Sequence, residues 1–387
     1  MRIGMFYKDF EAEGGFPRDF RKLATQLQQL GNDVYVYTYA EDSTSKKSKI
    51  SGVKVRRFRH KLVNSFFIPQ ELNSILKNNS DAIDILQIVG GYIPENIPVA
   101  RAAQKGKIPY VVIPLGNLSP IVSSYKNKLI KFAFTHLFLL PILRKALAVQ
   151  ASSEIEKKWI EYYNIRTPII VQGYLGIFKS DIPAVLQPNY LEKIKSDLKN
   201  KTKLVFLGRL DVFWKGLDLL ILAYAMMVRN ALRSDLALVL IGPDWNNGRA
   251  RLESLSKKYG IADNVFFLDP IYGQEKYSAL ADADLFIHPS RMDIQPRSVR
   301  EALGVGCPVI VTKETCIGEL IERYDAGVVV ELSARSICKK VVSLIRNTKK
   351  LARMRENAKM LSTEELDWAK IAQKLCLTYD KYLGIKR

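Results

Sequence analysis

The stretch ADADLFIHPSRMDIQPRSVREALGVGCPVIVT, residues 281–312, decides the fold. Its apolar run DLFIH (284–288) ends at a Pro-Ser pair, which predicts a short buried strand followed by a loop. Pro296 suits the first turn of a helix, and the apolar residues after it share one helix face. Two glycines then offer helix stops, and VIVT (309–312) predicts the next buried strand. Strand, loop, helix and strand in this order indicate a parallel α/β sheet.

Two carboxylates lie on either side of the start of this predicted helix. Asp293 falls in the loop, and Glu301 falls on the helix about one and a half turns in. Both would lie near the carboxyl end of a strand, where open α/β sheets bind ligands. An equally weighted interpretation of this stretch alone is a loop or cap aspartate and a solvated helix glutamate.

The same alternation extends outward from this stretch to both ends of the chain. It predicts strands at RIGMFY, VYVYTY, IDILQIV, YVVIP, LAVQAS and PIIVQG, with helical patterns between them. It lapses over the polar, lysine-rich residues 176–203 and restarts with LVFLG, LALVLIG and VFFLD. We therefore predict two doubly wound, Rossmann-like α/β domains over 1–180 and 200–365. The end, EELDWAKIAQKLCLTYDKYL (364–383), predicts one amphipathic helix, in a segment 366–387 that packs back on the body.

Composition limits the class of protein. The 387 residues are 48% hydrophobic, as in folded globular proteins. Four cysteines without a C-x-x-C pair argue against structural zinc and for a reducing compartment. The start MRIGMFYKDF has no signal-segment pattern, so we expect a cytoplasmic location.

The net charge is +20 and spreads over both halves of the chain, which favours polyanions or an anionic membrane surface. Its densest stretch, 46–61, has eight basic and no acidic residues, and we interpret it as a turn plus an exposed strand with solvated lysines. KLIKFAFTHLFLLPILRK (128–145) is too short and interrupted to span a membrane. It fits an interfacial helix or a core helix of the first domain.

Further candidate residues follow other predicted strands. GRLDVFWKG places Arg209 and Lys215 at a strand end before a helix, an arrangement suited to a diphosphate. The alternative is a surface Arg and Lys flanking Asp211. EAEGGFPRDF places Gly14 and Gly15 between a strand and a helix, which permits close backbone approach by a ligand. Because this is not G-x-G-x-x-G, a dinucleotide site is poorly supported.

Metal and hydrolase sites find little support. Asp282 and Asp284 have the spacing of a metal-binding D-x-D, but capping of a helix and a strand explains both. His60, His136 and His288 are far apart in the sequence, and we interpret none as a ligand. G-x-S-x-G, H-E-x-x-H and P-loop patterns do not occur. We expect no metal and no cofactor.

Taken in order, four segments resemble the glycosyltransferases of family 4: GGFPRDFRKLATQLQQLGNDVYVYT, GRLDVFWKGLDLL, ADADLFIHPSRMD and PRSVREALGVGCPVIVT. That family consists of retaining enzymes of the GT-B fold, in which two Rossmann-like domains face across a cleft and the donor is a nucleotide sugar. The resemblance covers nearly the whole chain. It implies a UDP- or GDP-linked sugar as substrate and a glycan or lipid-linked acceptor in polysaccharide assembly.

The resemblance also implies roles for particular residues. Arg209 and Lys215 would hold the donor diphosphate, Glu301 the ribose hydroxyls and Asp293 the donor sugar, so that Arg209, Lys215 and Asp293 carry catalysis. The remaining implied residues are Gly15, Gln295 and Arg297 on the donor side and Gly14, Gly15, Gly116 and Asn117 on the acceptor side.

The chain departs from the family pattern at two places. Asp293 stands where a glutamate is usual, and PLGNLSP after YVVIP has no histidine where many members have one, so that backbone and Asn117 would serve instead. Two alternatives stay open: a nucleotide-sugar epimerase of the same fold, and a basic polyanion-binding protein. We expect no nucleic acid partner, because aromatic residues do not alternate with the basic run.

Overall fold

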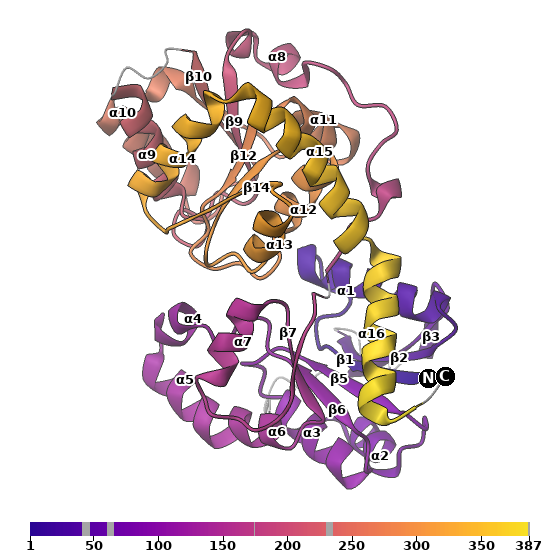
Figure 1. Ribbon diagram of the computed structural model, residues 1–387. Helices are drawn as coiled ribbons and strands as arrows, with labels where there is room; N and C mark the ends of the chain where they lie inside the picture. The colour runs from indigo at the N-terminus through magenta and orange to yellow at the C-terminus, as the bar shows by residue number, and fades with distance from the viewer. Residues whose placement is uncertain (41–46, 60–65, 174, 230–234, 386–387) are drawn as a thin grey trace. The chain divides into compact units, whose positions relative to one another are not determined.

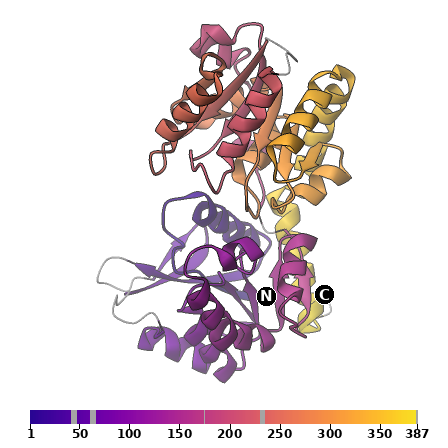
Figure 2. The same cartoon turned by 90° about the vertical axis from the view of Figure 1, so that its left-hand side faces the viewer.

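The computed structural model describes residues 1–40, 47–59, 66–173, 175–229 and 235–385. The chain forms two compact units (Figure 1). Unit 1 comprises Met1–Gly176 and Trp368–Arg387, and unit 2 comprises Ile177–Asp367. Each unit is built on a mostly or wholly parallel sheet with helices on its two faces (Figure 2). The predicted α/β class with two Rossmann-like folds is thus confirmed.

The sheet of unit 1 has the strand order β3-β4-β2-β1-β5-β6-β7-β8, and only β3 runs antiparallel to its neighbour. Its strands are β1 (Arg2–Phe6), β2 (Asp33–Ala40), β3 (Lys47–Ile50), β4 (Val53–Arg59), β5 (Ile85–Val89), β6 (Tyr110–Ile113), β7 (Ala148–Ala151) and β8 (Ile169–Val171). Its helices are α1 (Gly15–Gln29), α2 (Gln70–Asn78), α3 (Asn96–Lys105), α4 (Pro120–Ser124), α5 (Lys128–Phe134), the π-helix η1 (Thr135–Leu139), α6 (Leu140–Arg144), α7 (Glu154–Glu161) and α16 (Trp368–Leu383). The strands predicted in the first half of the chain all form.

The sheet of unit 2 is wholly parallel, with the order β11-β10-β9-β12-β13-β14. Its strands are β9 (Thr202–Leu207), β10 (Leu236–Ile241), β11 (Val265–Leu268), β12 (Leu285–His288), β13 (Val309–Thr312) and β14 (Gly327–Val330). Its α-helices are α8 (Tyr190–Ile194), α9 (Leu217–Arg229), α10 (Gly248–Tyr259), α11 (Gly273–Asp282), α12 (Arg297–Gly304), α13 (Gly318–Arg323), α14 (Ala334–Ile345) and α15 (Thr348–Glu365), and the short 3₁₀ turns are η2 (Lys179–Asp181), η3 (Ser196–Leu198) and η4 (Ala262–Asn264). The stretch that opened the sequence analysis forms β12, α12 and β13, as predicted.

Alternating side chains of the central strands build two cores in unit 2. Leu204 and Phe206 of β9 pack with α9 and α14 on one face, whereas Val205 packs with α12 and α15 on the other. Strands buried on both faces need near-continuous apolar sequence, which LVFL and LALVLI supply. The sheet is therefore rigid where it presents its carboxyl edge.

The basic stretch 46–61 differs from its interpretation as an exposed strand. Residues 46, 60 and 61 lie outside the described residues, but β4 pairs with β2 in parallel and with β3 in antiparallel fashion. Val53, Val55 and Phe58 of β4 are buried in the core, while Lys54 pairs with Asp33. The apolar residues between the lysines and arginines explain why the strand enters the sheet.

The segment 128–145 forms α5, η1 and α6 in unit 1. Pro141 at the start of α6 has no N–H, and its ring crowds the carbonyl four residues earlier, which accounts for the widened π turn just before it. Within the part of the chain that the structure describes, none of the helices combines the length and apolar character that crossing a membrane demands.

The predicted C-terminal helix forms, but it spans Trp368–Leu383 and does not begin at residue 364. α15 ends at Glu365 and α16 begins at Trp368, where the chain passes from unit 2 to unit 1. The carbonyl of Leu366 instead accepts a hydrogen bond from the Ile177 N–H at 2.7 Å. In unit 1, the buried Tyr379 hydroxyl of α16 bonds with Gln87 of β5 and Gln150 of β7.

Candidate functional site

The order of strands reverses beside the first strand of each unit, and ligands of open α/β sheets bind at such points. In unit 2 this point lies between β9 and β12, which pair in parallel. β9 is followed by Arg209 and Lys215, and β12 by Asp293. In unit 1 it lies between β1 and β5, which are followed by Gly14–Gly15 and by Gly90–Gly91. Gly14, Gly15, Arg209, Lys215 and Asp293 thus follow the strands at these points, and the predicted Gly116 and Asn117 follow β6, the next strand of unit 1.

Lys215 and Asp293 meet in unit 2. The Lys215 Nζ contacts Asp293 Oδ2, and the His288 Nε2 lies 3.1 Å from the same oxygen. The loop that holds Asp293 is fixed by its backbone, because the Asp293 N–H donates to the Glu314 carbonyl at 3.2 Å and its carbonyl accepts from Cys316 at 2.9 Å. The carboxylate is therefore held in place beside a lysine at the carboxyl edge of the sheet.

The environment of Asp293 and His288 fixes their charge states. Burial alone would raise the pKa of the Asp293 carboxyl, but Lys215 and His288 outweigh burial and hold that pKa well below its usual range. Burial, with Lys215 nearby, lowers the pKa of His288, which lies between the rings of Phe206 and Phe286. An ionised carboxylate only accepts hydrogen bonds, so Nε2 of the neutral imidazole carries the proton.

Stability should depend on His288 below pH 6.5. Since its pKa is lowered on folding, the unfolded chain binds a proton in this range that the folded chain does not, so acidification favours unfolding. We expect His288 to contribute at most about 1.4 kcal/mol of destabilisation per pH unit below about 6.5. Unfolding by urea at pH 7.5 and 5.5 checks this. His288→Gln keeps a donor for Asp293 and should lose less stability on acidification, whereas equal losses in both proteins would contradict the assignment.

Gly216 is required by close packing against the loop after β12. Its φ is +63°, and a Cβ there would lie 1.9 Å from the Pro289 carbonyl oxygen. Gly216→Ala should destabilise unit 2 by about 2–4 kcal/mol, the sum of a left-handed alanine and a backbone clash. Gly273→Ala is the control, because Gly273 has φ +54° but nothing within 4 Å of its Cβ position, and should cost about 1 kcal/mol. Thermal unfolding of both variants measures the difference, and equal losses would contradict it.

Arg209 lies on an aromatic ring. Its guanidinium carbon is 4.5 Å from the ring centroid of Trp245, in the loop after β10. The two loops are tied together, since the Leu210 N–H donates to the Pro243 carbonyl at 2.9 Å and a Cβ on Gly248 would meet the Leu210 carbonyl. Such stacking orients the guanidinium while leaving its N–H groups available in the ring plane.

Glu301 of α12 collects two cations on one oxygen. The Lys276 Nζ of α11 lies 2.6 Å from Glu301 Oε1, and the Arg297 Nε, one turn earlier on α12, lies 2.9 Å from it. The carboxylate is buried, with 4% of its side chain exposed, whereas both cations are partly exposed. Gln295 is buried at the start of the same helix, and its carbonyl accepts from the Arg300 Nε at 3.3 Å. Unit 2 thus carries two groups of charges after its parallel strands: Lys215 with Asp293, and Lys276 and Arg297 with Glu301. Arg209 lies after β9, the strand that also precedes Lys215.

The predicted residues of unit 1 form loops at the carboxyl edge of its own sheet. Gly14, with φ +137°, precedes α1, which starts without a side-chain cap, and nothing lies within 4 Å of the Cβ position of Gly15. The Asn117 Oδ1 accepts from the Gly91 N–H at 2.7 Å, which joins the loops after β5 and β6. The side chain expected to serve in place of a histidine therefore has its oxygen engaged in holding a loop.

A buried carboxylate positions the Gly116 loop. Glu156 of α7 accepts from the Gly116 N–H, the Ser152 N–H and the Ser152 hydroxyl, each at 2.7 Å. Burial raises the pKa of Glu156, while these hydrogen bonds oppose that shift. Gly116 has φ +68°, a conformation that favours glycine, so backbone and carboxylate together fix the turn after β6.

The D-x-D pair is tied to the fold. The Asp282 Oδ2 accepts from the Leu191 N–H at 2.9 Å, and Asp284 Oδ2 accepts from the Lys203 N–H at 2.8 Å. The Lys203 Nζ lies 3.4 Å from Asp282. These contacts agree with the structural explanation of both carboxylates.

Sequence reasoning missed Lys276, His288 and Trp245 as members of this site. His288 is the last residue of β12 and precedes Asp293 by five residues, so it lies at the same edge of the sheet. Because no other histidine is near it in the sequence, no motif drew attention to it. Lys276 lies in the first turns of α11, which follows β11, and Trp245 follows β10. The sequence signal that could have pointed to both residues is their position shortly after predicted parallel strands.

The comparisons agree on a class of enzyme. Residues 190–360 match the glycosyl transferases group 1 family. The lipopolysaccharide glucosyltransferase WaaG of Escherichia coli is 24% identical over 324 residues, which cover 82% of each chain. An uncharacterized glycosyltransferase of Methanocaldococcus jannaschii is 27% identical over 250 residues, which cover 64% of this chain. The match spans 62% of the archaeal protein, less than two thirds of its length.

Solved structures share the fold at low sequence identity. HepE of Anabaena, in complex with UDP and glucose, has a TM-score of 0.72 at 18% identity, covering 98% of this chain and all of that chain. Sucrose-phosphate synthase of Thermosynechococcus elongatus has a TM-score of 0.72 at 17% identity, with both chains fully covered. These findings show that the chain has the GT-B fold and that its residues 190–360 match the glycosyl transferases group 1 family.

Proposed function

We propose that the chain is a retaining hexosyltransferase that takes its sugar from a UDP- or GDP-linked donor. The observation that carries this proposal is the meeting of Lys215 with Asp293 at the carboxyl edge between β9 and β12, beside the stacked Arg209. Brought together at one donor site, Arg209, Lys215, Lys276 and Arg297 would outnumber the two carboxylates and supply the excess positive charge that a diphosphate needs. WaaG is named as a glucosyltransferase, and HepE was solved with UDP-glucose, which supports a uridine-linked hexose as the first donor to test.

In this proposal each cation has a part in breaking the sugar–phosphate bond. The bond between the anomeric carbon and the phosphate oxygen breaks, and the acceptor hydroxyl oxygen bonds to the same carbon on the same face. The acceptor proton passes to the leaving diphosphate, on which negative charge develops. Arg209 and Lys215 stabilise that charge through hydrogen bonds to its oxygens, each worth roughly 1.5–3 kcal/mol. Lys215 would leave Asp293 and contact the diphosphate instead. The Asp293 carboxylate could then accept a hydrogen bond from a hydroxyl of the donor sugar. Lys276 and Arg297 contact Oε1 of Glu301, and its other oxygen, Oε2, would accept hydrogen bonds from the ribose hydroxyls.

We further propose that the acceptor is a glycan or a lipid-linked glycan and that the enzyme acts as a peripheral protein on the cytoplasmic face of an anionic membrane. WaaG is involved in lipopolysaccharide biosynthesis, which supports a polysaccharide context. The net charge of +20 supports an anionic surface as the place of work. The four cysteines, all within the described residues, are buried and form no disulfide, which supports a reducing compartment. In unit 1, Gly14, Gly15, Gly116 and Asn117 are the proposed acceptor-side residues.

The test uses water as the acceptor, because slow hydrolysis needs no acceptor of known identity. The protein is incubated with UDP-glucose, UDP-galactose, UDP-N-acetylglucosamine and GDP-mannose, and proton NMR records the sugar released and its first-formed anomer. The proposal predicts hydrolysis of one donor with the anomeric configuration retained. An inverted anomer would contradict retention, and an epimerised nucleotide sugar would establish the epimerase alternative instead.

Two variants make the assay specific to the site. Arg209→Ala/Lys215→Ala removes two cations of the proposed diphosphate site and should abolish the hydrolysis. Arg251→Ala/Lys257→Ala removes the same formal charge from exposed positions of α10 in the same unit and should leave the rate unchanged. Equal rates in both double variants would overturn the assigned site.

A further inference from the structure

Unit 1 carries a cluster of exposed apolar side chains. Leu129, Ile130, Phe132 and Leu137 are between 62% and 82% exposed and lie within ten residues of α5 and η1. Phe67 is 70% exposed. We call these five residues the apolar face. Exposed apolar residues are normal when scattered singly, whereas a group on one helix marks an interaction surface.

Aromatic contacts bring the segment of Phe67 to the same helix. The ring of the neighbouring Phe66 lies 6.4 Å from Phe134 and 5.2 Å from Phe138, measured between centroids. Phe134 and Phe138 are partly buried beneath the exposed positions. The apolar face therefore includes residues from two segments of unit 1.

The helix that bears the apolar face is anchored in the fold. The opposite side of the helix is buried. Leu139, Leu140 and Leu143 pack in the core of unit 1, and Thr135 is buried beside them. Thr135 also contacts the Tyr92 hydroxyl at 3.2 Å. Because the buried side fixes the helix, the exposed side is presented to the surroundings in a definite orientation.

The charge along the helix that bears most of the apolar face has one sign. Residues 96–153 contain eight Lys and Arg and no Asp or Glu. Five of the eight flank or lie within the helix: Lys126, Lys128, Lys131, Arg144 and Lys145. The Lys131 ammonium turns back to the carbonyls of Val122 and Tyr125, at 2.7 and 2.6 Å, and the other four are exposed. An apolar face bordered by cations is the pattern of a segment that lies in a membrane interface.

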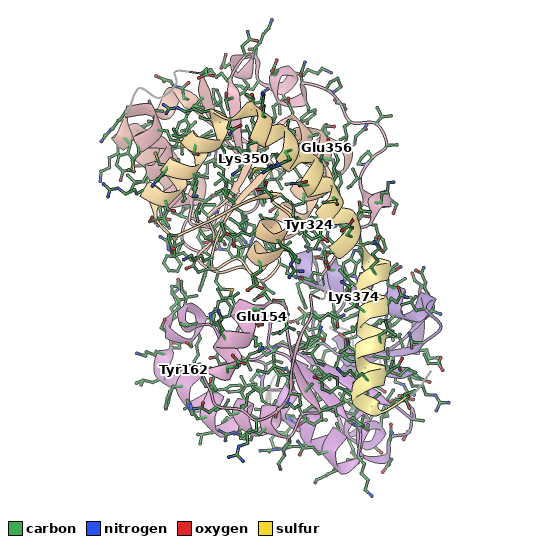
Figure 3. All side chains as sticks on the ribbon, in the orientation of Figure 1. Glu154, Tyr162, Tyr324, Lys350, Glu356 and Lys374 are labelled. Carbon is green, nitrogen blue, oxygen red and sulfur yellow. The ribbon has the colours of Figure 1, made fainter. Side chains whose placement is uncertain are left out.

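A groove adjoins the same helix. It has a volume of about 410 Å³ and is lined along the helix by Lys128, Phe132 and Arg144 and on the other side by Tyr162 and Tyr163 of the segment after α7. Figure 3 shows Tyr162 at the surface of unit 1. The hydroxyls of Ser123 and Ser124 also line it. Two cations and several hydroxyls beside an apolar rim fit a phosphate group attached to an apolar chain.

We propose that the apolar face inserts into the surface of an anionic phospholipid bilayer, with Lys128 and Arg144 contacting lipid phosphate in the adjoining groove. This inference deepens the proposed membrane context and rests on it for its biological meaning. A second copy of the chain is a poorer occupant, because pairing through this face would bring together two helices that carry basic but no acidic residues. A bilayer rich in anionic lipid supplies both the apolar depth and the opposite charge.

Vesicle co-sedimentation tests the proposal. The full chain is mixed with vesicles of phosphatidylcholine alone and of phosphatidylcholine with phosphatidylglycerol. We expect binding to the anionic vesicles and little to the neutral ones. Leu129→Ser/Ile130→Ser/Leu137→Ser should weaken that binding at least about tenfold. Val185→Ser/Tyr272→Ser is the matched control, since both residues are 72% exposed and lie in unit 2, and it should bind like the wild type.

A second variant tests the charged part. Lys128→Ala/Arg144→Ala should reduce the preference for phosphatidylglycerol over phosphatidylcholine several-fold, about the effect expected for two cations near an anionic surface. Circular dichroism checks that each variant is folded. An unchanged preference would overturn the role of the groove.

The outcomes separate this inference from the proposed enzyme function. Absence of binding to anionic vesicles, or wild-type binding by the triple variant, would overturn the inference, whatever the donor assay shows. A dimer in analytical ultracentrifugation that the triple variant loses would assign the face to self-association instead. Vesicle binding that depends on the apolar face supports the inference even where donor hydrolysis fails. Hydrolysis of the donor by the triple variant at the wild-type rate would confirm that the two sites are distinct.

Discussion

Replacing Lys215 by alanine should lower the rate of sugar transfer or donor hydrolysis by about 10²–10³, the loss expected on removal of one group that stabilises developing charge. The ammonium contacts the Asp293 carboxylate at the end of β9 and β12, where the strand order reverses. In the proposed reaction it moves to the leaving diphosphate, so its removal acts on the transition state more than on the donor complex. We therefore expect kcat to fall more than KM rises.

A double variant separates the two consequences of losing Lys215. Its removal also leaves Asp293 with His288 as its neighbour, and the pKa of Asp293 should rise toward its usual range because Lys215 is the largest influence holding it down. Lys215→Ala/Asp293→Asn eliminates that stranded carboxylate. The double variant should stay as slow as the single one or slower. Recovery of the rate would mean that Lys215 serves chiefly to neutralise Asp293.

Replacing Glu301 by alanine should weaken binding of the nucleoside diphosphate about 10- to 100-fold, which corresponds to one or two lost hydrogen bonds to ribose hydroxyls. Glu301 is buried and is oriented by Lys276 and Arg297 through one of its two oxygens. Calorimetry with the diphosphate and with its 2′-deoxy and 3′-deoxy forms measures the contribution of each hydroxyl.

The deoxy forms make the Glu301 assignment specific. The wild type should prefer the full ribose, and Glu301→Ala should lose that preference while still binding weakly. Glu301→Gln keeps a hydrogen-bond acceptor but removes the negative charge that pairs with two cations. Its preference for the full ribose should lie between those of the wild type and Glu301→Ala. If Glu301→Ala discriminates among the three ligands as the wild type does, Glu301 does not contact the ribose.

The strands and their order of appearance could be predicted because buried parallel strands need continuous apolar runs. DLFIH and VIVT are such apolar runs, and they contain β12 and β13. The break of the C-terminal helix could not be predicted in this way. Residues 364–383 keep a helical period across Leu366 and Asp367, and the change of partner from unit 2 to unit 1 depends on a backbone contact with the distant Ile177.

The residues after β9 and β12 were within reach of the sequence, but their contacts were not. Arg209, Lys215, Asp293 and Glu301 were predicted from strand ends and resemblance. The pairing of Lys215 with Asp293 and of Lys276 with Glu301 joins positions 78 and 25 residues apart, and no local pattern records such distances. Asp293 stands where the family usually has a glutamate, and the structure shows that Lys215 contacts this shorter side chain.

Calorimetric titration tests most directly whether unit 2 binds a nucleoside diphosphate. UDP, GDP and ADP are titrated into the wild type, Arg209→Ala/Lys215→Ala and the surface control Arg251→Ala/Lys257→Ala. We expect that one of UDP and GDP binds selectively to the wild type and the control, and that the double variant at positions 209 and 215 loses this binding. Absence of binding by all three diphosphates, or equal binding by both double variants, would contradict it.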